Sequence, residues 1–76
     1  MSTLEQLNKG RSAVIETLSG TPGFVNRAAA MGFTPGARVT AVQNTRTLPL
    51  LVHLRDTLVA IDRHDAERIA IHEPSK

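Results

Sequence analysis

The chain has 76 residues, with nine lysines and arginines, seven aspartates and glutamates and no cysteine. This length predicts a single domain (residues 1–76) near the lower size limit for folding without disulfides or metal. The absence of cysteine excludes a disulfide framework, a zinc ribbon, an iron–sulfur cluster and a thiol nucleophile. No apolar run is as long as a membrane span, and residues 1–5 (MSTLE) lack the features of a signal peptide, so we expect a cytoplasmic protein.

The net charge of +2 is distributed unevenly along the chain. Six basic and two acidic residues give residues 1–55 a net charge of +4, whereas three basic and five acidic residues give residues 56–76 a net charge of −2. Nucleic-acid-binding surfaces usually carry denser Lys/Arg clusters together with aromatic side chains. Because the chain has two phenylalanines and no tryptophan or tyrosine, we do not expect it to bind nucleic acid. The charge could give a basic face for an acidic partner, but an ordinary solvated surface is the simpler interpretation.

The chain is predicted to begin with a helical turn and a strand. Two leucines three residues apart in TLEQL (residues 3–7) favour one helical turn, opened by Ser2 or Thr3. Residues 12–18 (SAVIETL) are rich in β-branched and apolar side chains and predict a strand that ends at Ser19-Gly20.

A short helix is expected next. Thr21 is placed to cap it, and Pro22 stands at the first helical position, where no N–H is needed. Phe24, Ala28 and Met31 follow the spacing i, i+4 and i+7, which places them on one helical face. We expect Phe24, Met31 and the later Phe33 in the core.

Residues 31–40 (MGFTPGARVT) combine a helix end with a tight turn. Gly32 is predicted at the C′ position with a left-handed backbone, and Phe33 is expected to pack back on Ala28 in a Schellman motif. Pro35 and Gly36 occupy the second and third positions of a type II turn over residues 34–37. The roles expected for Gly32, Pro35 and Gly36 are therefore structural.

Beyond this turn the apolar pattern has a period of two. Residues 39–43 predict a strand, residues 44–47 a polar loop, and residues 50–55 a half-buried strand in which Leu50, Val52 and Leu54 face inward. Asp56-Thr57 is predicted to be a short hairpin connection, and residues 58–61 the next strand. Asp62 is expected to cap one helical turn through residue 67, followed by a last strand over 69–71 and a frayed tail over 72–76.

Five short strands with one small helical insert predict an all-β fold. The expected architecture is a small SH3-like β-barrel of about five strands, because closure of a small sheet protects most of its edges.

No residue pattern in the chain is typical of a catalytic or metal site. The three histidines, His53, His64 and His72, lie far apart in the sequence. His64, Asp65 and Glu67 share one turn and could hold a weak cation, but a solvated polar cap is favoured, because metal sites need convergent, supported ligands. No serine or threonine comes with a base, no carboxylate pair is suited to acid–base work, and a G-K-[ST] phosphate loop is absent. We expect no metal, no cofactor and no enzymatic activity.

Two surfaces are candidates for binding a protein. The first is the helix with its following turn, where we expect Asn26, Arg27, Ala30 and Thr34 to be exposed, and Arg27 to leave the helix opposite the Phe24/Ala28/Met31 face. The second is Leu48-Pro49, because a stiff apolar loop tip is unusual if it contacts nothing. Ordinary packing of that loop over one end of the barrel is an equal alternative.

The order of these motifs resembles the FeoA family. The similar segments are Gly10 with SAVIETLSG (12–20), the helix with Arg27, MGFTPG (31–36), PLLVHL (49–54), LVAID (58–62) and DAERIAI (65–71), so that the resemblance runs from about Leu4 to Ile71. The chain departs from the family pattern at residues 28–29, where a leucine is common, and at residues 48 and 56–57, where glycines are common.

The resemblance implies an SH3-like β-barrel and a cytoplasmic accessory role in ferrous iron uptake. Members of the family work with the FeoB membrane transporter, whose cytoplasmic part binds GTP, which makes that part the expected partner. A related domain occurs at the C-terminus of iron-dependent repressors of the DtxR type. A small nucleic-acid-binding or transcription-regulatory module is therefore the alternative. The chain starts at Met1 and spans one domain, which favours the free-standing form.

Overall fold

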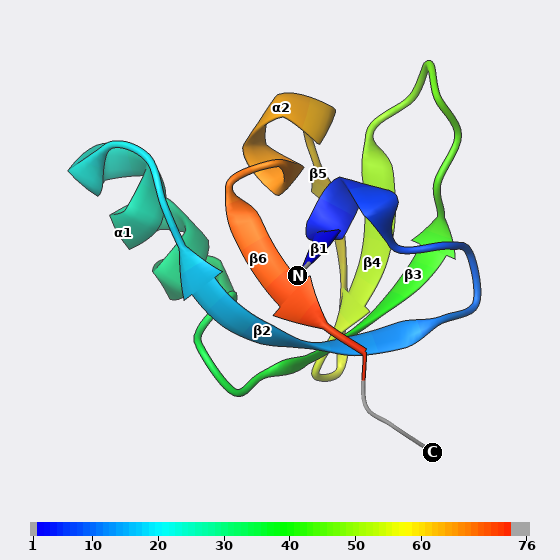
Figure 1. Cartoon of the computed structure of the whole chain (residues 1–76), viewed down its shortest axis with the longest axis horizontal. Helices are drawn as coiled ribbons and strands as arrows, with labels where there is room; N and C mark the ends of the chain where they lie inside the picture. Colours follow the sequence, from blue (N-terminus) through cyan, green and yellow to red (C-terminus); the bar gives the residue numbers. More distant parts are fainter. Residues whose placement is uncertain (1, 74–76) are drawn as a thin grey trace.

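The protein forms a six-stranded antiparallel sheet with a helix inserted after its second strand (Figure 1). The structure, a computed structural model, describes residues 2–73. The strands are β1 (Ser2–Thr3), β2 (Ser12–Leu18), β3 (Arg38–Gln43), β4 (Leu50–Leu54), β5 (Thr57–Ile61) and β6 (Ile69–His72). The helices are a 3₁₀ turn, η1 (Leu4–Gln6), a ten-residue helix, α1 (Pro22–Met31), and one turn, α2 (Arg63–Ala66). None of these helices is long and apolar enough to cross a membrane.

The strand order is β1-β6-β2-β3-β4-β5, and every neighbouring pair is antiparallel. The predicted all-β class with a short helical insert is confirmed, with six strands rather than about five. The extra strand is β1, whose two residues pair with Ala70 and Ile71 of β6. Two residues are too few to show a sequence period. Within residues 2–73, β1 and β5 stand at the two ends of the order, so closure into a barrel stays a prediction.

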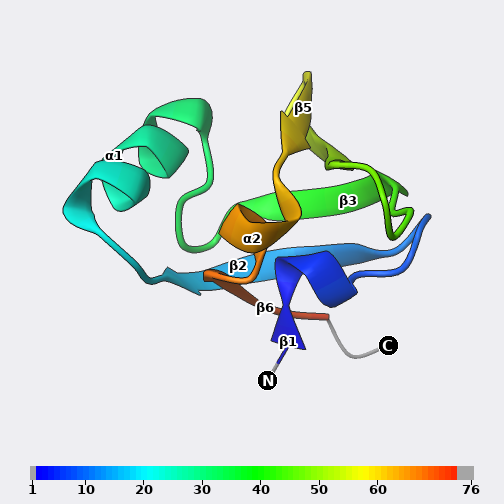
Figure 2. The same cartoon turned by 90° about the horizontal axis from the view of Figure 1, so that it is seen from above.

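The core lies inside the curve of the sheet, which bends so that β2 and β6 lie below β3 and β5 in Figure 2. It is built from alternate strand residues together with side chains from η1, α1 and α2, and no polar residue among residues 2–73 is fully buried. Its largest fully buried side chains are Phe33, Leu4, Leu7, Ile15, Leu50, Leu54, Ile69, Ile71, Val39 and Val52. The inward alternation predicted for β4 is confirmed. Each such Leu, Ile, Val or Phe contributes about 1.5–3 kcal/mol on burial.

Helix α1 begins and ends where the sequence predicted. The Thr21 hydroxyl accepts a hydrogen bond from the Phe24 N–H at 3.2 Å, and Pro22 stands at the first helical position. At the other end Gly32 has φ 109°, and its N–H donates to the Ala29 carbonyl at 3.0 Å. The Phe33 N–H donates to the Ala28 carbonyl at 2.9 Å. These two bonds are those of a Schellman motif.

The turn after the helix is also confirmed. The Ala37 N–H donates to the Thr34 carbonyl at 3.0 Å, and Gly36 has φ 91°. A positive φ at the third position is the mark of the type II turn. The turn is held to the sheet as well, because the Gly36 N–H donates to the Ile15 carbonyl at 2.8 Å and the Ile15 N–H donates to the Ala37 carbonyl at 2.9 Å.

Three predictions about the fold were wrong. Met31 is 49% exposed, not a core residue. The β4–β5 hairpin turns at Arg55-Asp56, so that Thr57 already belongs to β5, and Arg55 takes φ 59°. The predicted frayed tail was wrong for residues 72 and 73: His72 belongs to β6, and Glu73 pairs with Arg11 at 2.7 Å. Residues 74–76 of that tail lie outside the described part.

Candidate protein-docking site

A pocket of about 180 Å³ lies between helix α1 and the segment that joins β5 to α2. Its lining is mainly apolar and includes three charged side chains, those of Arg27, Asp62 and Asp65. The other lining residues are Phe24, Ala28, Met31, Phe33, Ala60 and Ile61. Phe24, Ala28, Phe33 and Ile61 are core residues, so the pocket opens directly onto the hydrophobic core. An apolar side chain from another molecule would extend that core outward.

Arg27 is exposed and lines this pocket beside Phe24, Ala28 and Met31. The prediction that it leaves the helix opposite that face was wrong. At 100° per residue, Arg27 stands about 60° from Phe24 around the helix, which places it on the flank of the apolar face. Among residues 2–73 the guanidinium forms no ion pair. A cation without a local partner at the margin of an apolar pocket is suited to a carboxylate from outside.

The opposite wall of the pocket is acidic. Asp62 is exposed and stands at the N-cap of α2, but its side chain makes no capping hydrogen bond. Asp65, one turn further, is 3.6 Å from the Arg68 guanidinium. The helical turn predicted to begin at Asp62 is therefore present, but the Asp62 carboxylate does not cap it and is exposed to solvent.

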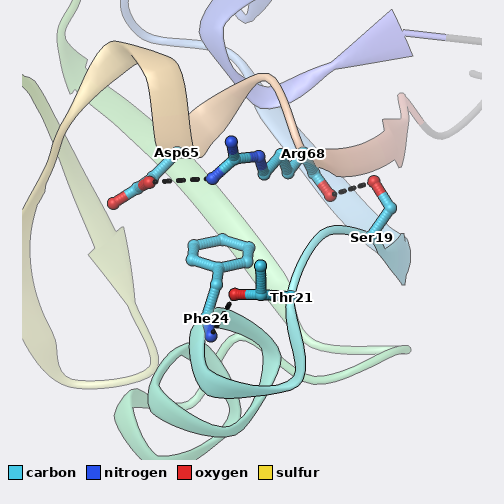
Figure 3. A network of polar contacts seen from close by, with 5 residues as sticks. All are labelled: Ser19, Thr21, Phe24, Asp65 and Arg68. Carbon is cyan, nitrogen blue, oxygen red and sulfur yellow. Dashed lines mark hydrogen bonds and ion pairs between the residues drawn. The ribbon is translucent and has the colours of Figure 1, made fainter.

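Arg68 joins the two walls of the pocket (Figure 3). Its guanidinium carbon lies 5.8 Å from the centre of the Phe24 ring, within the range of a cation–π interaction. Its carbonyl accepts hydrogen bonds from the Ser19 N–H at 2.8 Å and the Ser19 hydroxyl at 3.3 Å. A Cβ at Gly20 would lie 2.9 Å from the Arg68 side chain, so glycine is needed there for this contact. Arg68 therefore links α1 to α2 at the pocket, through its contacts with Phe24 and Asp65.

The predicted docking residues fall on two separate surfaces. Asn26, Arg27 and Ala30 are exposed on α1, as predicted, and of these only Arg27 lines the pocket. The prediction that Thr34 is exposed was wrong, because its side chain is half-buried after the helix end. In the β3–β4 loop, Leu48 is 48% exposed and Pro49 is exposed, and neither lines the pocket. The structure thus presents both predicted surfaces and does not bring them into one site.

Sequence reasoning missed the second wall of the pocket. The sequence predicts Ala60 and Ile61 only as strand residues. It predicts Asp62 as a helix cap, and Asp65 as part of the same turn or of a weak cation site. The signal available in the sequence was the spacing of Arg27 and Met31 from Phe24, since residues three and seven apart share one side of a helix. The sequence does not indicate that β5 lies opposite this side of α1.

The histidines are separate in the structure as well. His53 is exposed on β4, as predicted, and the His72 Nδ1 lies 2.8 Å from a Glu16 carboxylate oxygen. Within residues 2–73 no three His, Asp or Glu side chains converge to hold a metal ion. The expectation that the protein has no metal site stays a prediction.

Comparison with known proteins finds one matching family model and several solved structures with the same fold. A family model described as the FeoA domain matches residues 2–73. Among solved structures, an iron uptake regulatory protein (FeoA) has 19% identity and a TM-score of 0.87, with 96% of each chain covered. FeoA of Stenotrophomonas maltophilia, solved with zinc, has 28% identity and a TM-score of 0.82 over 93% of this chain and 89% of that one. That relative is described as an SH3 domain protein possibly acting as a bacterial ferrous iron transport activating factor.

A manganese-dependent transcriptional repressor in complex with manganese has the same fold in part of its chain. The TM-score is 0.89 and the identity 14%, over 96% of this chain but 36% of the repressor. Among curated protein sequences none matches significantly. The fold is therefore SH3-like, and the family model covers nearly the whole chain. On this evidence the chain belongs to the FeoA family.

Proposed function

We propose that this protein is a cytoplasmic, non-catalytic accessory of ferrous iron uptake that binds the GTP-binding part of a FeoB-type membrane transporter. Membership of the FeoA family supports the iron-uptake context. The description of the Stenotrophomonas maltophilia relative as a possible activating factor of ferrous iron transport supports a role as a regulator of a transporter.

The observation that carries the proposal is the composition of the α1 surface. Met31 is 49% exposed, and next to it stand the guanidinium of Arg27 and an apolar pocket. Hot spots of protein interfaces typically combine an arginine with an apolar anchor in a pocket. The surface thus has the make-up of a contact with another protein.

The basic wall of the site, at Arg27, fits an acidic group of the partner, and the acidic wall, at Asp62 and Asp65, lies across the pocket from it. Residues 1–55, which include α1, carry a net charge of +4. Exposed charges are screened over about 10 Å at 0.1 M salt, so the complex should weaken as salt is added.

Replacement of Arg27 by glutamate tests the proposal. An exposed substitution usually changes the free energy of unfolding by less than about 0.5 kcal/mol, so the variant should remain folded. It should co-purify less with the transporter and support less ferrous iron uptake in cells, because the new carboxylate faces an acidic surface. The matched control is Arg38→Glu, at an exposed arginine on β3 that does not line the pocket. It should leave both measurements near the parent values.

Two results would contradict parts of the proposal, one concerning the docking surface and the other the partner. If Arg27→Glu binds and supports uptake like the parent, α1 is not the docking surface. In that case Leu48→Ser, in the β3–β4 loop, should show the loss instead. If neither variant differs from the parent and the parent itself does not co-purify with the transporter, the transporter is not the partner.

The alternative function is a transcription-regulatory module, favoured by the likeness to the manganese-dependent repressor. At 14% identity that likeness concerns the fold. Binding to duplex DNA, followed by fluorescence anisotropy at several salt concentrations, separates the two functions, since a DNA-binding module loses affinity steeply with salt.

A further inference from the structure

Strand β5 has one unpaired edge. It pairs with β4 and stands at the end of the strand order among residues 2–73. Its sequence, TLVAI (57–61), contains no charge and no proline. Edge strands in native proteins are usually protected by charges, prolines or bulges, because an exposed edge is a template for pairing with another chain. β5 has none of these devices between residues 57 and 61.

The strand register shows which backbone groups face outward. A two-residue turn joins β4 to β5, so that Leu54 and Thr57 next to it form a hydrogen-bonded pair, and pairs alternate from there. Thr57, Val59 and Ile61 therefore direct their N–H and C=O groups to β4. Leu58 and Ala60 direct theirs to the free edge, and neither takes part in another backbone hydrogen bond within residues 2–73.

The free edge adjoins the pocket beside α1. Ala60 and Ile61 of β5 line that pocket opposite Phe24 and Met31 of the helix. Consider a strand added along this edge, with one of its residues directly opposite Ala60. The two neighbours of that residue would point to the same side of the sheet as Val59 and Ile61, because side chains alternate along a strand. That side contains the core, and the pocket opens onto the core beside Ile61, so one of these side chains would reach the apolar space.

A second copy of this chain is a poor occupant of the edge. Antiparallel pairing that uses all the free groups would place Leu58 of one copy opposite Ala60 of the other. The same register brings Asp56 and Asp62, which flank the strand, next to Asp62 and Asp56 of the second copy. Like charges directly opposite one another destabilise a strand pair.

We propose that an extended segment of the partner protein adds to β5 as a further strand, through the backbone of Leu58 and Ala60. The segment places an apolar side chain in the pocket and an acidic side chain against Arg27. Main-chain hydrogen bonds supply affinity in this mode of recognition, and the pocket supplies specificity. The inference rests on the proposed function for the identity of the partner, the cytoplasmic part of a FeoB-type transporter.

Amide exchange of single residues, followed by NMR, tests the pairing directly. In the free protein the Leu58 and Ala60 amides should exchange fast and those of Val59 and Ile61 slowly. Addition of the transporter's purified cytoplasmic part should slow exchange at Leu58 and Ala60 by about tenfold or more, as two new hydrogen bonds form. Binding without this slowing would overturn the β5 proposal and leave the proposed function standing.

Two variants separate edge pairing from general surface contact. Ala60→Pro removes only the N–H that faces the free edge, and proline is tolerated on edge strands, so the fold should persist by circular dichroism. Binding should weaken about tenfold. Val42→Lys is the control: it changes an exposed apolar residue of β3, 39% exposed, away from the edge, and should bind like the parent. Equal weakening in both variants contradicts the proposal.

If the transporter's cytoplasmic part does not bind at all, the proposed function fails and a second probe decides on the edge. The probe is a displayed library of random 12-residue peptides selected on the folded parent protein. Peptides that lose binding to Ala60→Pro and keep it to Val42→Lys support the edge site, and a selection without such peptides overturns it. A dimer of the free protein that Leu58→Lys dissociates would identify a second copy as the occupant and overturn the proposed one.

Discussion

At the scale of single residues, Gly32 shows how a backbone requirement and a packing requirement coincide. Its φ of 109° belongs to the region that side chains other than glycine rarely adopt. The sequence predicted this conformation from the helix stop. The structure adds that a Cβ at Gly32 would lie 3.1 Å from a methyl group of Leu54, a buried residue of β4. A side chain at this position would therefore be unfavourable for two reasons, the positive φ and the close contact with Leu54.

Gly32→Val should lower the free energy of unfolding by more than about 1 kcal/mol, because it adds a clash to an unfavourable backbone conformation. Chemical denaturation measures the change. Gly36→Ala is the control: its φ is 91°, but a Cβ there meets nothing within 4 Å, so only the backbone penalty applies. Gly32→Ala should cost more than Gly36→Ala, and an unchanged midpoint for Gly32→Val would refute the assignment of the helix end.

At the scale of elements, the N-terminal turn η1 is held in place by side chains from distant parts of the chain. The Asn44 amide donates hydrogen bonds to the carbonyls of Glu5 and Leu7, at 3.0 and 2.8 Å. Arg63 in turn donates to the Asn44 side-chain oxygen at 2.7 Å. A three-residue helical turn cannot stand alone in water, because nucleation of a helix is costly. Leu4 and Leu7, both fully buried, supply the apolar part of the attachment.

Asn44→Ala should lower the free energy of unfolding by about 2 kcal/mol. The Leu7 carbonyl loses its side-chain donor, and the Glu5 carbonyl keeps only the longer bond from Arg63, at 3.4 Å. Urea denaturation gives the size of the loss, and amide exchange at residues 4–7 should become faster. Thr47→Ala, at an exposed position of the same loop, is the control and should be neutral. A loss below about 0.5 kcal/mol for Asn44→Ala would mean that the buried leucines alone hold the turn.

At the scale of the whole molecule, the protein is expected to fold and persist without iron. Its core is apolar and continuous, and no three His, Asp or Glu side chains converge to hold a metal ion within residues 2–73. In the one turn where the sequence gathers such residues, Asp65 already lies 3.6 Å from Arg68. A fold that depends on a metal needs several ligands that converge in the folded state, because binding of the ion there supplies the free energy of folding.

Thermal unfolding should therefore be the same with and without a chelator. Anaerobic calorimetric titration with Fe²⁺ should show no site tighter than roughly 10 μM, because scattered polar groups are weak ligands for this ion. A stoichiometric, tighter site that disappears in His64→Ala would overturn the prediction and place a metal at α2.

The sequence by itself determined the features that depend on a residue and its near neighbours. The capped start of α1, the Gly32 helix end, the Pro35-Gly36 turn and the alternation of β4 are local, because each follows from backbone preferences over four to seven residues. The exceptions were local features with a weak signal: β1 has two residues, and the β4–β5 turn uses Arg55, which has no preference for a positive φ.

Only the tertiary structure decided which surfaces face one another. Helix periodicity groups Phe24, Ala28 and Met31, but Met31 is half exposed because the pocket, rather than another element, lies beside it. The free edge of β5 follows from the strand order, and the acidic wall across from Arg27 follows from where the β5–α2 segment packs. The position of α1 beside the β5–α2 segment depends on contacts between residues more than thirty positions apart in the chain. A periodic pattern indicates which face of an element is buried, but not which element covers that face.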